Sequence, residues 1–466
     1  MNLRGGTLFG GDTLGRCEIR TVIPTQMNPR IGIAYQITPS TVIRTGYGIF
    51  YGMPPYGAGR HYTGAAFQSE TPWVTTVDGI TPTGNLSNPF PDGYNFFTGR
   101  ANGLTTQVGF TIWDGWPDSL RANYNQQWNF TIQRQFGGRM MMEVAYAGNK
   151  GTNLAYFLPS VELNQMDPAL LPMGNTLLEQ VPNPFAGIVT VGTLATPTIQ
   201  RGQLLRPYPQ YTGFQAKNAG WANSKYHALL ARFERRFASG LTVQSSYSFS
   251  KTISDAADGL WNMANGIRNF YCLKCERAVS SYDQPHRFVT NITYELPFGR
   301  GKQFGAGVIR VVDAVLGNWQ VNGILTISKG LPLRNFSLSS NTCFCFGGTQ
   351  RPNSTGTSAA LSEGQTIDRW FDTRQIVAPA SFTFGNLGRT LATVPSDNAR
   401  NLVFSIFKSF RPTERVGVQF RAEAFNLTNT PLIAQPNTQV GSPLFGAVTS
   451  QENNPRQIQL GLKILF

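Results

Sequence analysis

The last ten residues of the chain, QIQLGLKILF (457–466), decide the fold class. Ile458, Leu460, Leu462, Ile464 and Phe466 are apolar, and the residues between the first four are polar or small. Because successive side chains of a β-strand point to opposite faces of the sheet, this period of two predicts a strand with one apolar and one polar face.

The same alternation recurs in segments that follow one another as pairs. The pairs are 31–37 with 43–51, 128–132 with 140–146, 233–237 with 241–249, 288–296 with 319–327, and 402–406 with 416–424. Glycine, proline and serine occur in most of the short connections, which predicts tight antiparallel hairpins. The connection 297–318 is longer, and its segment 308–316 fits a short amphipathic helix.

Long segments rich in Gly, Pro, Asn, Ser and Thr separate the hairpins, at 52–122, 151–224, 253–283, 329–399 and 428–456. Compact soluble domains rarely contain several loops longer than about 15 residues. Outer-membrane barrels, in contrast, have short periplasmic turns, long outer loops and strands of about 10 residues with alternating polarity. Aromatic residues also cluster near the strand ends, as in an aromatic girdle. The sequence therefore predicts an all-β fold, a transmembrane antiparallel up-and-down β-barrel.

Composition excludes several other classes. The charged fraction of 14% and aromatic fraction of 12% are unlike disordered chains and coiled coils. No apolar run approaches the ~18 residues of a membrane-spanning helix. The net charge is +14, but without a Lys/Arg cluster it does not indicate nucleic-acid binding. A soluble β-sandwich would have short loops at both ends, and a propeller would repeat a signature every ~40–45 residues.

Six blocks of the sequence together carry a family resemblance. They are NPRIGIAYQITPSTVIRTGYGIFYG (28–52), NYNQQWNFTIQRQF (123–136), MEVAYAGNKGTNL (142–154), YHALLARFERRFASGLTVQSSYSFSKTISDA (226–256), DQPHRFVTNITYELPFGRGK (283–302) and FRAEAFNLTNTP (420–431). In this order they resemble the C-terminal barrel of Oar-like TonB-dependent receptors of Gram-negative bacteria. The resemblance extends from about residue 28 to Phe466.

The resemblance implies an outer-membrane receptor that takes up or recognises an unknown extracellular substrate. Family members have a signal peptide, a regulatory β-domain, a plug with a TonB box and a barrel of about 22 strands. This sequence shows about 11 strands and none of the preceding parts. We therefore expect 1–27 to be a truncated barrel or loop lead-in, and 28–466 to be a partial barrel domain. The partners implied are the outer-membrane bilayer, TonB only through a plug and TonB box, and the extracellular ligand.

Two other functions stay open at this point. One is a structural or adhesive surface barrel without transport, and the other is a soluble β-rich binding protein. Enzyme signatures are missing, because the three histidines are scattered and no nucleophile elbow or phosphate loop occurs. We expect neither catalysis nor a cofactor.

The C-terminal strand itself carries a candidate signal. An aromatic C-terminus on an amphipathic last strand resembles the feature by which the barrel-assembly machinery recognises its clients. Phe466, Ile464 and Leu462 are the residues concerned. The alternative is an ordinary edge strand that ends in Phe, and the strand pattern of the whole chain favours the signal.

Cysteines form two close pairs in the long segments, Cys272 with Cys275 and Cys343 with Cys345. Together they could bind zinc, but a C-x-C pair is atypical of zinc sites. Because the cell surface is oxidising, disulfides are favoured over metal binding or unpaired thiols. We expect Cys17 to be unpaired.

Charged residues on the polar sides of the predicted strands are candidates for the barrel lumen. They are Arg421, Glu423, Glu143, Glu234, Arg287 and Glu295, accompanied by Gln419 and Gln244. They would either line a substrate path or form a wall that contacts solvent or a plug, and the sequence favours the wall.

Overall fold

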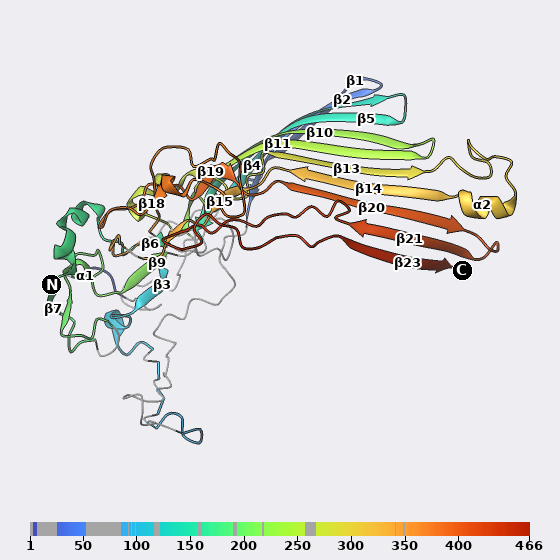
Figure 1. Cartoon of the computed structure of the whole chain (residues 1–466). Helices are drawn as coiled ribbons and strands as arrows, with labels where there is room; N and C mark the ends of the chain where they lie inside the picture. Colours follow the sequence, from blue (N-terminus) through green and yellow to red (C-terminus); the bar gives the residue numbers. More distant parts are fainter. Residues whose placement is uncertain are drawn as a thin grey trace.

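One large antiparallel sheet dominates the computed structural model of the chain (Figure 1). The structure describes residues 3–6, 26–52, 85–91, 93–94, 96–97, 99–115, 122–156, 161–189, 193–216, 219–256, 267–340, 342–347 and 350–466. In spatial order the strands of the sheet are β1 (Arg30–Thr38), β2 (Thr41–Tyr51), β4 (Tyr124–Phe136), β5 (Met140–Tyr156), β10 (Ala219–Ala238), β11 (Leu241–Ser254), β13 (His286–Glu295), β14 (Trp319–Ser328), β20 (Ala399–Phe410), β21 (Gly417–Phe425) and β23 (Gln457–Leu465).

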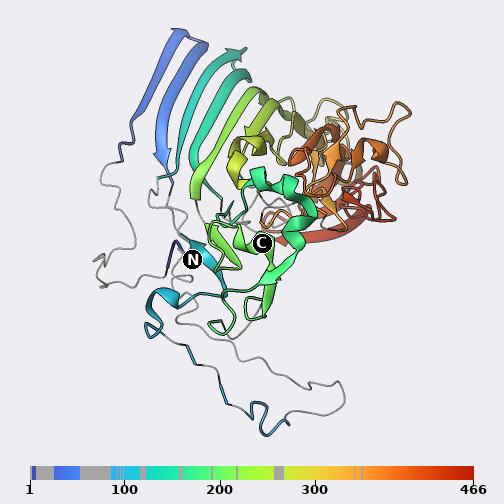
Figure 2. The same ribbon diagram turned by 90° about the vertical axis from the view of Figure 1, so that its left-hand side faces the viewer.

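Each strand of this path lies beside its predecessor and its successor, so the sheet is an up-and-down meander. The eleven strands and five hairpins are those that the alternation predicts. β12 (Ala278–Val279) adds a short pairing to β11. The meander is one curved layer, and no second sheet of similar size packs on it within the described part of the chain, which excludes a β-sandwich (Figure 2). No helix among the described residues has the length and apolar character needed to cross a membrane.

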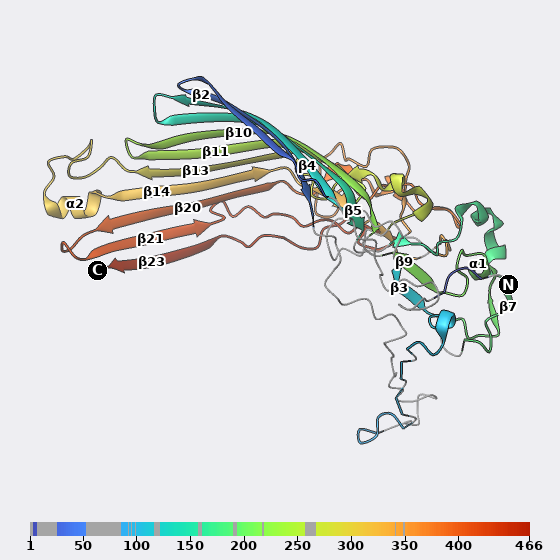
Figure 3. The same cartoon turned by 180° about the vertical axis from the view of Figure 1, so that it is seen from behind.

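The short connections lie together at one end of the sheet, opposite the long ones (Figures 1 and 3). The β10–β11 turn shows why these turns need particular residues. Ser239 and Gly240 both have positive φ angles, 52° and 80°, as a two-residue hairpin requires. A Cβ at Gly240 would also lie 2.7 Å from the Glu295 carbonyl oxygen, so the turn has no space for a side chain.

Residues that pair across neighbouring strands point to the same face, so each face of one strand continues into the same face of the next strand over the whole sheet. Val243 lies opposite Arg235 and Ile292, whereas its neighbour Gln244 lies opposite Glu234 and Asn291. On the apolar face of β23, four side chains are 56–70% exposed, namely Ile458, Leu460, Leu462 and Ile464. A continuous exposed apolar face is what a lipid-contacting wall requires.

The described parts of the long connections fold into a cap at the far end of the sheet, which differs from their expected loop character. Its short strands are β3 (Thr111–Gly115), β6 (Val161–Glu162), β7 (Gln180–Pro182), β8 (Thr198–Gln200), β9 (Gly213–Ala216), β15 (Pro332–Arg334), β16 (Ser337–Leu338), β17 (Asn353–Ser354), β18 (Ile376–Val377), β19 (Thr390–Pro395) and β22 (Gln439–Val440). Its helices are η1 (Gly103–Thr105), η2 (Pro168–Leu178), α1 (Arg201–Leu204), η4 (Phe270–Glu276) and η5 (Thr373–Gln375). The helix α2 (Arg310–Leu316) confirms the predicted amphipathic helix and lies at the opposite, turn end.

Buried clusters hold the cap together. The largest contains Leu333, Phe371 and Leu387, against which Ile433 and Phe445 of the last connection pack. In another, side chains from η2 and from the segment around the second cysteine pair meet. The connections therefore pack against one another, and the cap has small cores of its own.

Two strands end the meander. Among the described residues, β1 pairs with β2 and β23 pairs with β21, each along one side. Both strands run toward the turn end of the sheet.

Candidate functional site

The polar face of the sheet contains all six charged residues that the sequence singles out. Arg421 and Glu423 lie on β21, opposite Phe407 and Ser405 of β20. The Nε atom of Arg421 donates to Gln419 Oε1 at 2.7 Å, and its guanidinium carbon lies 4.9 Å from the centre of the Phe407 ring. The Arg421 side chain is therefore held along the wall by its neighbours.

A second charged group lies across β5 and β10. Glu143 faces Arg232 in the register, and Glu234 contacts Arg232 at 3.1 Å and Arg236 at 3.4 Å. This group includes Gln244, which faces Glu234. Three strands, β13, β14 and β20, separate this group from Arg421 and Glu423.

The remaining two candidates share β13 but lie at its opposite ends. Glu295 forms an ion pair with Lys302 at 3.0 Å near the turns. Arg287 lies near the cap, opposite Ser248 and Ser328. The polar face is thus a wall with spaced charged groups, not one cluster of convergent side chains.

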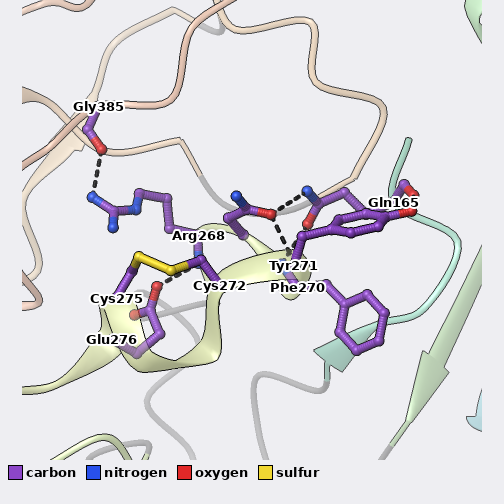
Figure 4. Close-up of a disulfide and its surroundings, with 9 residues drawn as sticks. Gln165, Arg268, Phe270, Tyr271, Cys272, Cys275, Glu276 and Gly385 are labelled. Atoms are coloured by element: carbon purple, nitrogen blue, oxygen red, sulfur yellow. Dashed lines mark hydrogen bonds between the residues drawn. A yellow bond between two sulfur atoms is a disulfide. The ribbon is translucent and has the colours of Figure 1, made fainter. Parts of the chain in front are cut away.

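The cap contains a buried ionic centre between the third and fourth long connections, and Figure 4 shows two of its members, Glu276 and Arg268. Glu276, at the end of η4, accepts a hydrogen bond from Arg351 at 2.6 Å, and side-chain exposure is 0% for the glutamate and 3% for the arginine. The backbone N–H of Arg268 donates to the other Glu276 oxygen at 3.1 Å, and the Arg268 side chain donates to the Gly385 carbonyl at 2.6 Å. Burial lowers the pKa of Arg351, and the charge of Glu276 opposes that shift.

Arg389 joins the same centre to the end of the barrel strands. Its Nε donates to the Glu276 carbonyl at 2.9 Å, and its terminal nitrogens donate to the carbonyls of Ser254 and Ala256. Because Ser254 ends β11, the guanidinium ties the position of the cap to the sheet. These arginines lie in segments without periodic patterning, so the sequence pattern did not predict their role, and the adjacent cysteine pair was the nearest signal.

Both cysteine pairs lie in the cap and are disulfides in the structure. Cys272 and Cys275 bridge within η4, next to Glu276 (Figure 4). Cys343 and Cys345 bridge within the cluster that contains Met166. In the described part of the chain, no group of three or more His, Cys, Asp or Glu residues has a metal-binding arrangement. Cys17 lies outside the described residues.

The C-terminal residues are exposed in the structure. β23 ends at Leu465, one residue before the predicted end, and Phe466 is fully exposed. Leu462 and Ile464 lie on the apolar face, 65% and 56% exposed.

Structural comparison finds solved outer-membrane proteins that are similar to this chain over part of their length. The outer membrane transporter YddB from Escherichia coli has a TM-score of 0.40 and 8% identity, over 91% of this chain and 38% of that protein. The ferric-catecholate import receptor Fiu from K12 E. coli has a TM-score of 0.40 and 9% identity, over 94% and 35%. The chain therefore spans less than two fifths of the length of these structures.

Two comparisons at the level of sequence gave different results. Comparison with curated proteins gave no match. A family model described as an outer membrane beta barrel domain, however, matches residues 3–459. An outer-membrane location excludes the soluble β-rich protein that the sequence left open. The single antiparallel meander agrees with this match, and the chain belongs to the outer membrane beta barrel domain family.

Proposed function

We propose that the chain forms part of the barrel wall and the extracellular cap of an Oar-like TonB-dependent receptor. This receptor takes up an extracellular substrate or recognises it at the cell surface. The combination of a polar inner wall with a folded cap at one end carries this proposal. A barrel that served only as a membrane anchor would not need interlocked connections with a buried ionic centre.

Each part would have a separate task. The cap would present the binding surface, and the ionic centre around Glu276 would hold that surface in shape. The polar face would form the wall of the lumen, where Arg421 and the Glu234 group contact solvent or a plug. In such a receptor TonB would act through a plug and a TonB box, and the barrel would surround the plug.

Assembly requires a further partner. We propose that the exposed Phe466, with Ile464 and Leu462, is the segment that the barrel-assembly machinery recognises. All three side chains are accessible, and they share the apolar face by their spacing of two residues.

Uptake is tested by comparing cells that produce the protein with a deletion strain. Both are grown in a complex medium, and the depletion of medium components is followed by mass spectrometry with and without a proton uncoupler. We expect at least one component to be depleted only by producing cells, and only without uncoupler.

Surface recognition is tested on the same cells with the components of that medium. Binding that persists without depletion would support a recognition or adhesive barrel without transport. The proposed function would be contradicted if the producing cells showed neither more depletion nor more binding of any component than the deletion strain.

A further inference from the structure

The β13–β14 connection differs from the other hairpin turns because it displays an apolar helix. Residues 296–318 include α2, and along it Val311 is 74% exposed and Val315 65%. Ile309 and Leu316, at its two ends, are 69% and 52% exposed. Exposure of this many branched side chains is costly in water, since each gains about 1.5–3 kcal/mol on burial.

Val311 and Val315 form an apolar stripe that the helix turns away from the rest of the connection, whereas Leu316, three residues after Asp313, lies on the Asp313 side. The backbone N–H of Arg300 donates to Asp313 Oδ1 at 2.5 Å, so Asp313 faces the preceding loop. At 100° per residue, Val311 and Val315 project from the side of the helix opposite Asp313. Hydrogen bonding of Asp313 therefore fixes which face of α2 is presented outward.

Trp319, on the apolar face of the sheet, marks the depth at which α2 lies, and the buried Lys408 beside it holds the end of the helix in place. Trp319 begins β14 and lies opposite Lys408 of β20, whose amino group is 5.5 Å from the indole centre. Trp319 Nε1 donates to the Val315 carbonyl at 2.8 Å, and the Lys408 amino group donates to the Gly317 carbonyl. Tryptophan at the end of a membrane-spanning strand is typical of the headgroup level of a bilayer. The C-terminal end of α2 is thus fixed at that level.

The charge of the connection fits a phospholipid surface. It contains three basic residues, Arg300, Lys302 and Arg310, of which Lys302 is paired with Glu295 of β13, and one acidic residue, Asp313. Two further exposed aromatics, Phe298 and Phe304, pack on each other with ring centres 5.6 Å apart. An apolar stripe with flanking basic residues is the pattern of helices that lie in a membrane interface.

We propose that α2 lies on the periplasmic leaflet of the outer membrane, with Val311 and Val315 in the boundary between headgroups and acyl chains. The partner is phospholipid, because the hydrogen bond from the Trp319 indole to the Val315 carbonyl joins the last turn of α2 to the apolar, lipid-facing side of β14. This rests on the proposed function in one respect, the assignment of the turn end to the periplasm.

The test places an environment-sensitive dye at position 311 through a non-canonical amino acid, which avoids the native cysteines. The matched control carries the dye at Glu414, in the exposed β20–β21 turn at the same end of the sheet. Both proteins are examined in isolated outer membranes and, after purification, in nanodiscs of phosphatidylethanolamine and phosphatidylglycerol. We expect blue-shifted emission at 311 that headgroup-level nitroxide lipids quench at least twofold more strongly than at 414, with iodide showing the reverse.

Equal iodide quenching at both positions would overturn the proposal. Protection of position 311 in outer membranes but not in nanodiscs would also overturn it, in favour of a protein partner. A dye-labelled Val315→Asp variant should become accessible to iodide at position 311 while its heat-modifiable migration shows a folded sheet. Fractionation reports outer-membrane location separately, so failure of this proposal is distinguishable from failure of the proposed function.

Discussion

The Glu276 carboxylate and the Arg351 guanidinium lie 2.6 Å apart, where both side chains are almost inaccessible to water. Removing one partner of a buried pair leaves the other charge without compensation, at a cost of about 3–5 kcal/mol. We expect Glu276→Gln to increase hydrogen exchange throughout the third and fourth connections and leave the exchange of the barrel strands unchanged.

An exposed pair of similar geometry is the control. Arg201 and Glu179 lie 2.8 Å apart, with side chains 42% and 53% exposed. Glu179→Gln should change local stability by at most about 1 kcal/mol. Equal effects of the two substitutions would show that the cap does not depend on the buried centre.

Adjacent leucines on β10 test which face contacts lipid. Leu229 shares the apolar face with Phe249, whereas Leu230 lies on the polar face opposite Ser248. An arginine on the lipid side costs about 2–4 kcal/mol near the bilayer centre, so Leu229→Arg should lower the yield of folded protein in outer membranes. Leu230→Arg should be tolerated, and the reverse order would invert the assignment of the faces. Heat-modifiable migration on gels measures the folded fraction.

Gly148 leaves space for an indole ring. It lies between Trp128 and His227 in the register, and a Cβ there would overlap the Trp128 ring. We expect Gly148→Ala to displace the indole and cost about 1–3 kcal/mol, as overpacking usually does. Urea unfolding in micelles, followed by tryptophan fluorescence, measures the loss.

Gly323 is the control for that substitution. It lies on the same face of the sheet, and nothing is within 4 Å of a Cβ built there. Gly323→Ala should leave the unfolding midpoint unchanged or slightly raised, and a loss as large as that of Gly148→Ala would refute the role of the indole contact.

The hydrogen bonds of Asp372 predict that the surrounding region of the cap loses stability in acid. Hydrogen bonds from Arg374 and Gln375 hold the pKa of this carboxyl well below its usual range. Its contribution to stability is therefore present above the unfolded pKa of about 3.9 and is lost as the pH falls below that value. Hydrogen exchange at η5, corrected for intrinsic rates, should rise below pH 4 in the natural protein. In Asp372→Asn it should be raised already at neutral pH, and identical profiles would contradict the assignment.

Substitution of Phe466 and of Leu465 tests whether assembly depends on the terminal aromatic residue or on any hydrophobic residue at the C-terminus. Both side chains are exposed, but they point to opposite faces of the last strand. Phe466→Ala should reduce the amount of assembled barrel severalfold in outer-membrane fractions, and Leu465→Ala should not. A similar loss in both variants would remove the specific role of Phe466.

The membrane strands were predictable because lipid on one side and a polar lumen on the other impose a period of two on every strand, as in QIQLGLKILF. The cap has no such uniform boundary. Its contacts, such as Arg389 to the carbonyl of Ser254, join residues far apart in sequence, and no local pattern announces them. The charged residues of the wall were therefore predictable from the strand pattern, and the ionic centre of the cap was not.

The shared direction of β1 and β23 has a consequence for closure of the sheet. Joining these two edges directly would make a parallel ladder in an otherwise antiparallel wall. In lipid every edge must find hydrogen-bond partners, and antiparallel closure requires that the strand beside each edge run the opposite way. The parity of the meander thus sets a counting rule: a ring that is antiparallel throughout has an odd number of further strands between β23 and β1.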